Sequence, residues 1–380
     1  MQETTLTKAE AQARLVRRAS MVPCRLAFID CKMPGSEKKE NYSLIGAGVT
    51  QSAEQVVNLT DPHGFSLGVA AMPPGTVNNL HVHYTAEVFM VFKGTWTFRW
   101  GANGDEGEVV GRAGDVVSIP TWIFRGFTNS GQDDGWIFTA LGGDDTGGIL
   151  WHPSILENAA RHGLYLTRDN MLVDTEAGAP KPAPEALIRP MTQADITALP
   201  RYSPAEMASR MVTTAQRNWS DRALLDSHLP GHASRIAPVL GHGISQDATQ
   251  LPPIRNPHGL AIEWLRIEPG NQVGPFMLPV KQALIVFKGA ARVTLNAPDK
   301  GIALDAASQE LVSVPGNVWR SIACAGSEPV EIAVLTAGNG PAQVTWWPAL
   351  AEAALAKGVG IDHAGYLAPA HLLPAAQAAA

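Results

Sequence analysis

Short runs rich in Val, Ile, Phe, Trp and Thr alternate along this chain with Gly, Pro, Asn and Asp. That spacing is typical of an antiparallel β-sandwich or barrel. The segment 95–100, TWTFRW, places an aromatic residue at every second position, which predicts a strand with two unlike faces. The pattern therefore predicts an all-β chain.

A helical segment follows the last of these runs. It extends from Pro153 to His162, and Gly163 stands where a helix C-cap is expected. The same arrangement recurs from Pro348 to Lys357, before Gly358. The chain is therefore predicted to carry short helices beside its strands.

The two helical segments belong to an internal repeat. The dipeptide at His63 recurs at His258, and 258 minus 63 is 195. The same offset relates Pro74-Gly75 to Pro269-Gly270, Gly94 to Gly289, Pro120 to Pro315 and Trp151 to Trp346. A frame held over a hundred residues indicates a tandem duplication. We expect one domain over residues 1–185 and a second over 186–380, with the Pro- and Ala-rich stretch 176–190 as linker.

Composition excludes several classes of function. The 380 residues carry a net charge of -6, which gives no electrostatic case for nucleic acid or an anionic membrane as partner. Three cysteines without CxxC spacing argue against disulfides or a structural zinc site. The polar N-terminus and the lack of a long apolar run lead us to expect a cytoplasmic protein without membrane spans.

The clearest chemical signal is His81, His83 and Glu87. Residues two apart in a strand share a face, so both imidazoles project one way. A turn over 84–86 would bring Glu87 onto the antiparallel neighbour. Two imidazoles and one carboxylate form a facial ligand set for a divalent metal, Fe(II) first, with Mn, Zn or Ni open. An exposed HxH strand beside a surface carboxylate is the plain alternative.

The spacing Gly75-x5-His81-x-His83-x3-Glu87-x6-Gly94 resembles the first motif of the cupin superfamily. Residues 114–129, from Gly114-Asp115 through Pro120 to Asn129, resemble the second motif in part. With the repeat, the resemblance implies a bicupin: two double-stranded β-helix (jelly-roll) barrels in tandem with short flanking helices. A homodimer fits that family.

The second motif departs from the family at one ligand. The resemblance implies a histidine five residues after the proline, where this chain has Arg125 and, in the second copy, Arg320. A guanidinium offers no lone pair to a metal. Either Arg125 faces the pocket and fixes a substrate anion, or it has a structural role, which its persistence in the second copy supports.

The second copy also lacks the ligand set. Phe276, Leu278 and Gln282 stand where the first copy has His81, His83 and Glu87, so we expect a scaffold barrel there. In the first copy the segment 120–124, PTWIF, resembles a stretch of gentisate-type dioxygenases, which are also bicupins. We expect the substrate pocket to be walled by Phe89, Trp122 and Phe124.

These features predict a metal-dependent enzyme. The leading function is an Fe(II)-type dioxygenase in the first barrel acting on a small organic acid or phenolic compound, with Arg125 as the catalytic residue that orients an anionic substrate. A redox-neutral decarboxylase, isomerase or lyase is the second hypothesis. A non-catalytic small-molecule-binding bicupin is the third.

Overall fold

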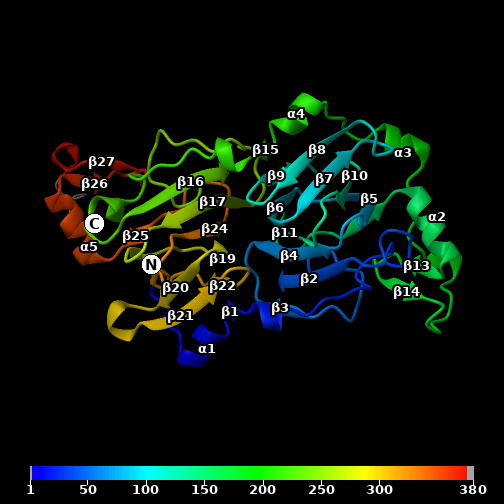
Figure 1. The fold of residues 1–380 in the computed structure, drawn as a ribbon, viewed down its shortest axis with the longest axis horizontal. Coiled ribbons are helices and arrows are strands. Elements are labelled where there is room, and N and C mark those ends of the chain that lie inside the picture. The colour runs from blue at the N-terminus through cyan, green and yellow to red at the C-terminus, as the bar shows by residue number, and fades with distance from the viewer. Residues whose placement is uncertain (1, 375–380) are drawn as a thin grey trace. The chain divides into compact units, whose positions relative to one another are not determined.

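The computed structural model describes residues 2–374, which form two compact units. The first unit, Met21–Ala215, is called the first barrel below. The second barrel combines the segment before Met21 with the chain from Gln216 onward. Each barrel is built from two facing, mainly antiparallel sheets (Figure 1), which confirms the predicted all-β class.

The boundary between the units differs from the one expected after residue 185. The helices α3 (Gln193–Thr197) and α4 (Pro204–Ala208) pack on the first barrel. The strand β15 (Met211–Val212) belongs to the larger sheet of that barrel. Conversely, α1 (Lys8–Gln12) and β1 (Leu15–Val16) belong to the second barrel. Each barrel therefore closes with a segment from beyond its own repeat.

The expected linker is part of the first barrel as well. The N–H of Ile188 donates to the Leu166 carbonyl at 2.9 Å, and the N–H of Arg168 donates to the Ala186 carbonyl at the same distance. A short 3-10 helix, η2 (Pro184–Ala186), lies in this stretch. Pro and Ala content suggested a spacer, but its backbone groups are paired with the barrel.

In the first barrel, one sheet has seven strands and the other has five. The larger sheet runs in the order β15, β9 (Val116–Ile119), β6 (Glu87–Lys93), β11 (Gly135–Gly142), β4 (Phe65–Met72), β2 (Glu40–Ile45), β3 (Val57–Leu59). The smaller sheet runs in the order β12 (Ile149–Trp151), β5 (Val77–His83), β10 (Arg125–Asn129), β7 (Thr95–Trp100), β8 (Gly107–Arg112). The helix α2 (Pro153–Arg161) and the hairpin of β13 (Leu164–Leu166) and β14 (Leu172–Asp174) follow.

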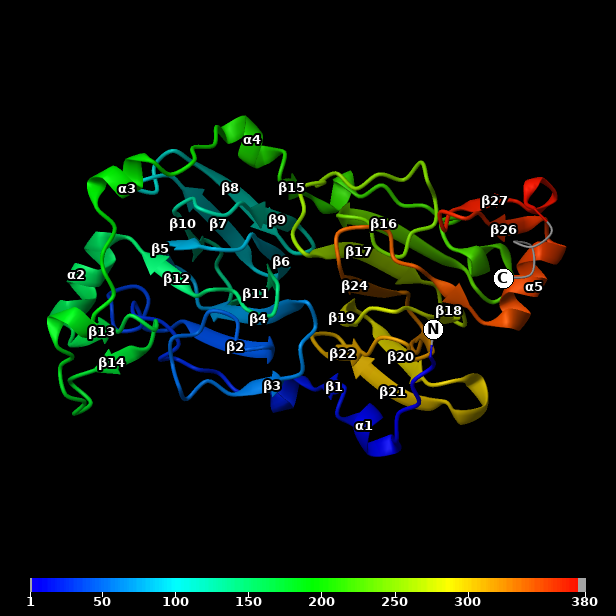
Figure 2. The same cartoon turned by 180° about the vertical axis from the view of Figure 1, so that it is seen from behind.

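The second barrel repeats this plan (Figure 2). Its larger sheet runs in the order β1, β22 (Leu311–Val314), β19 (Gln282–Lys288), β24 (Val330–Ala337), β17 (Leu260–Ile267), β16 (Ser234–Leu240). Its smaller sheet runs in the order β21 (Ile302–Ala307), β20 (Ala290–Leu295), β23 (Arg320–Cys324), β18 (Gln272–Met277), β25 (Thr345–Trp346). The helix α5 (Pro348–Ala356), the hairpin of β26 (Val359–Ile361) and β27 (Leu367–Pro369), and the 3-10 helix η6 (Ala370–Leu372) follow.

The elements confirm the predicted repeat and its local signals. Strand β4 begins at 65 and β17 at 260, and 260 minus 65 is again 195. The aromatic residues of β7 are buried, while the residues between them are half-buried, as the alternation predicts. Gly163 follows α2 with φ 69°, a conformation that glycine adopts without steric cost. None of the helices described is long and apolar enough to span a membrane.

Candidate metal centre

His81, His83 and Glu87 converge inside the first barrel. All three side chains are buried, and their ligand atoms lie within 4.8 Å of one another. The imidazole rings, from one face of β5, have centroids 4.9 Å apart. The plain alternative, an exposed HxH strand, is therefore wrong.

The route by which the three side chains meet differs from the expected hairpin. Strand β5 pairs with β10 and β12, whereas β6 pairs with β9 and β11, so the two lie in opposite sheets. The chain crosses between layers over residues 84–86. Glu87 therefore faces the histidines across the barrel interior and not from a neighbouring strand.

The geometry fits one divalent ion. Adjacent ligands of an ion bound at about 2.1 Å are about 3 Å apart, and Nε2 of His83 lies 3.5 Å from Oε2 of Glu87. Nδ1 of His81 lies 2.7 Å from the Asn79 carbonyl, which can only accept. That hydrogen bond places the proton on Nδ1 and leaves the Nε2 lone pair for a metal.

The protonation states suit metal binding. Burial, reinforced by the charge of Arg125, lowers the pKa of His81 and His83 well below the usual value, so both imidazoles are neutral. Burial raises the pKa of Glu87 to about 7, although Arg125 opposes that shift. A bound cation would favour the carboxylate form of Glu87.

We expect metal affinity to depend on pH below about 7. Glu87 must lose its proton to bind, so the apparent affinity for Mn²⁺ should rise about tenfold per pH unit up to the pKa of Glu87 and then level off. Calorimetric titrations between pH 5.5 and 8.5 would measure this slope. A flat profile across that range would show that Glu87 does not exchange its proton for the metal.

Arg125 points into the same interior. It is 1% exposed, its Nε lies 3.4 Å from Oε2 of Glu87, and its Nη1 donates to the Ile123 carbonyl at 3.2 Å. Burial lowers the pKa of Arg125 to about 10, so the guanidinium keeps its charge at neutral pH. Arg125 therefore holds the Glu87 carboxylate in place of the histidine that the family motif would supply.

The second barrel shows what a fully paired arginine looks like at this position. Arg320 donates from Nη1 to Oε1 of Gln282 at 2.9 Å and from its other nitrogens to the Val318 and Pro315 carbonyls. In contrast, four buried polar atoms beside the metal ligands make no hydrogen bond within the described residues, although two of them, Arg125 Nε and Glu87 Oε2, form the ion pair given above. The four are His83 Nδ1, Glu87 Oε2, Arg125 Nε and Arg125 Nη2. Buried polar atoms of this kind need a partner such as an ion, a water or a ligand.

A small cavity opens onto the three ligands. Its volume is about 50 Å³, and its wall includes His81, His83 and Glu87. A water needs roughly 10–15 Å³ of such space, so the cavity has room for a few waters or for a ligand of a few non-hydrogen atoms. Gly68 and Ala70 of β4, which have little or no side chain, form part of its wall.

The residues expected to wall the pocket lie elsewhere. Phe89 packs in the core against Phe98 and Phe127. Phe124 is buried in a separate cluster with Val82. Trp122 is 38% exposed and packs edge-on against Tyr84. Aromatic residues near the motif suggested a pocket. Phe89 shares the inward face of β6 with Glu87 but lies farther along the barrel, and the turn over 120–124 keeps Trp122 and Phe124 off the cavity wall. Arg125 is not on its wall either.

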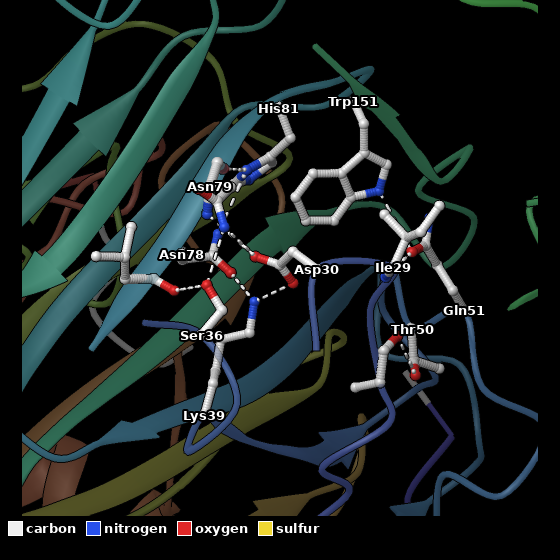
Figure 3. A network of polar contacts seen from close by, with 12 residues as sticks. Ile29, Asp30, Ser36, Lys39, Thr50, Gln51, Asn78, Asn79, His81 and Trp151 are labelled. Carbon is white, nitrogen blue, oxygen red and sulfur yellow. Dashed lines mark hydrogen bonds and ion pairs between the residues drawn. The ribbon is translucent and has the colours of Figure 1, made fainter. Parts of the chain in front are cut away.

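A polar network behind the ligands could not be predicted from the sequence (Figure 3). Lys39 donates to Asp30 at 2.5 Å and to Asn78 at 2.6 Å. Asp30 also accepts from the backbone and side-chain nitrogens of Asn79, whose carbonyl orients His81. Lys39 and Asp30 lie in irregular segments about forty residues upstream of the motif, where no spacing connects them with it.

The second barrel has no comparable centre among the described residues. Phe276 and Leu278 join its apolar core, and Gln282 donates to Thr336 at 3.0 Å. Glu263 stands at the position of Gly68, since 68 plus 195 is 263, and accepts from the Ile244 and Ser245 N–H groups. The Glu263 side chain is fully buried, and Leu265 joins the apolar core of the second barrel.

Comparison with known proteins agrees with this architecture. A family model described as a cupin domain matches residues 68–139. Oxalate decarboxylase from Bacillus subtilis (W96F) is 12% identical with a TM-score of 0.54, covering 89% of this chain and 80% of that chain. Hazelnut (Corylus avellana) vicilin is 12% identical with a TM-score of 0.52, covering 88% of each chain. A 7S globulin from Momordica charantia is 12% identical with a TM-score of 0.52, covering 88% of this chain and 86% of that chain.

No curated protein sequence matches the chain. At 12% identity the structural likenesses show the fold alone, because the same fold carries many functions. The domain match falls on the strands that hold the three ligands, and the repeat extends the same architecture to the second half. Residues 68–139 therefore match a cupin domain, and the chain as a whole has a fold of two similar barrels.

Proposed function

We propose that the first barrel is a metal-dependent enzyme site for a small organic acid, with an Fe(II)-type dioxygenase as the leading reaction class. The observation that supports this most is the buried His81, His83 and Glu87 cluster on the wall of a small cavity. A set of two histidines and one carboxylate leaves coordination positions open, and such sites are typical of non-haem Fe(II) oxygenases. The size of the cavity favours a small organic acid over a phenolic ring.

The residues of the chain have separate roles in this proposal. His81, His83 and Glu87 would hold the ion, which would supply Lewis acidity and, as Fe(II), the means to use O2. Asn79 keeps His81 in the tautomer that presents Nε2. Arg125 fixes the Glu87 carboxylate, and its unpaired Nη2 adds positive potential beside the cavity, which favours an anionic substrate.

A redox-neutral decarboxylase, isomerase or lyase is the second candidate. The same ligand set supports it, because a Lewis-acidic ion needs the same open positions. Oxalate decarboxylases share this fold, and one of those structures concerns Mn(II) centres, so a small dicarboxylate with Mn(II) is a concrete alternative. A vicilin and a 7S globulin share the same fold, and a non-catalytic small-molecule-binding protein is the third candidate.

Oxygen consumption separates these candidates. Protein purified without chelator would be loaded with Fe(II) or Mn(II) and given small carboxylic acids, with O2 uptake and CO2 release followed together. Uptake of O2 coupled to substrate loss is the expected result. Release of CO2 without O2 uptake would replace the dioxygenase by a decarboxylase, and binding without turnover would leave a binding protein. The homodimer and the cytoplasmic location remain predictions from the sequence.

A further inference from the structure

One cation on the cavity wall is not a metal ligand. Lys39, immediately before β2, is 5% exposed, and its Nζ donates to Asp30 and Asn78 (Figure 3). An ammonium group has three hydrogens to donate, so these two acceptors leave one. Lys39 lines the same cavity as His81, His83 and Glu87.

This fold does not need a lysine to accommodate the buried acid. The counterpart of Asp30 in the second barrel is Asp226, which accepts from the Gly274 N–H at 2.7 Å and contacts Nδ1 of His232 at 3.0 Å. Strand pairing identifies the counterpart of Lys39: Glu40 pairs with Ala71 and Arg235 with Arg266, an offset of 195 in both cases. Lys39 therefore corresponds to a serine, Ser234. The buried ammonium occurs only in the barrel that has the metal ligands and the cavity.

The charged residues around the cavity indicate that Lys39 is the residue that would contact an anionic ligand. Among the described side chains on the wall, the charged ones are Lys39, Glu40 and Glu87, so Lys39 is the one cation. Glu40 is already bound by Arg25 and Tyr42, each at 2.7 Å. The Nζ of Lys39 also lies 5.1 Å from the centre of the Phe28 ring, which packs beside it without offering a hydrogen-bond acceptor.

We propose that Lys39 is a substrate-binding residue whose third ammonium hydrogen donates to a carboxylate oxygen of a small organic acid in the cavity. The inference rests on the proposed function and deepens it. It gives Lys39 the anion contact that the sequence suggested for Arg125, and it leaves Arg125 as the residue that positions Glu87. A charge-assisted hydrogen bond of this kind is roughly twice as strong as a neutral one.

The test compares binding of metal and of carboxylate in matched variants. D30N/K39M removes both charges of the buried pair, so that neither is left alone. D226N/H232Q makes the matching change in the second barrel. Calorimetry would measure Mn²⁺ binding to the full chain, followed by binding of acetate, oxalate and pyruvate to the Mn²⁺-loaded protein.

D226N/H232Q should bind Mn²⁺ like wild type. D30N/K39M should still bind Mn²⁺ but about tenfold more weakly, because Asp30 supports Asn79, whose carbonyl orients His81. The tightest-binding carboxylate should bind D30N/K39M about 30-fold more weakly and D226N/H232Q unchanged, from the strength of a charged hydrogen bond. Equal carboxylate binding by wild type and D30N/K39M would overturn the proposal.

A wild type that binds no Mn²⁺ would refute the metal site instead, and the carboxylates would then be titrated against the metal-free proteins. Weaker binding by D30N/K39M there would still support Lys39. If wild type binds none of the three acids, either with Mn²⁺ or without it, the proposed role of Lys39 is overturned.

Discussion

Glu87→Gln is expected to abolish metal binding by the whole chain. The substitution replaces the single carboxylate of the ligand set by a neutral amide of nearly the same shape. Loss of a ligand exceeds the effect of removing its supporting hydrogen bonds, which is about 10- to 100-fold, so affinity should fall by more than about 100-fold. Elemental analysis of protein purified without chelator, with Mn²⁺ titration, would measure the change from one ion per chain to none.

The second barrel shows why the Glu87→Gln variant should fold. It also provides a control variant. Arg320 and Gln282 already form the arginine–glutamine pair that Arg125 would make with the new side chain. The reciprocal variant Gln282→Glu adds a carboxylate to a barrel whose other two positions are Phe276 and Leu278, and it should gain no metal. Stoichiometric metal in Glu87→Gln would contradict the proposed ligand set.

Lys39→Met is expected to destabilise the first barrel by about 3 kcal/mol or more, the usual cost of leaving a buried charge without its partner. Asp30 is fully buried, and Lys39 is its only cationic partner among the described residues. The pairs of Asp30 with Asn79 survive the change but do not neutralise its charge. Calorimetric unfolding of the full chain would show a lower transition temperature.

The double variant D30N/K39M should recover most of that loss, because it removes the uncompensated charge and places methionine against Phe28 and Trp151. Lys38→Met, at the exposed neighbouring position, serves as control and should change stability by less than about 0.5 kcal/mol. Equal destabilisation in the single and double variants would show that packing, and not the ion pair, is what Lys39 contributes.

Local patterns in the sequence were sufficient for the repeat, the strands and the choice of ligands. The alternation of β7 predicts its buried face because side chains in a strand alternate with period two. The spacing of His81 and His83 predicts that they share a face for the same reason. The helix before Gly163 is predicted from its C-cap. Each of these signals depends on residues close together in the chain.

Features that depend on pairing between distant segments escaped prediction. The strands β5 and β6 are consecutive, yet they lie in opposite sheets, so Glu87 meets the histidines across the interior. The segment 186–215 completes the first barrel because β15 pairs with β9, a contact that repeat arithmetic cannot reveal. Phe89, Trp122 and Phe124 are absent from the cavity wall because they pack against side chains from other segments, such as Phe127, Tyr84 and Val82.

The sequence by itself determined which barrel can hold a metal, because ligand chemistry belongs to single residues: His81, His83 and Glu87 have lone pairs to offer, and Phe276 and Leu278 do not. Only the tertiary structure decided what surrounds that site. It directs Arg125 to Glu87, forms the cavity beside the three ligands, and brings Lys39 to the wall of that cavity. The physical reason is that the burial and the electrostatic potential at a site depend on segments that are far apart in the chain. The spacing of residues along the sequence does not show which of these segments come together.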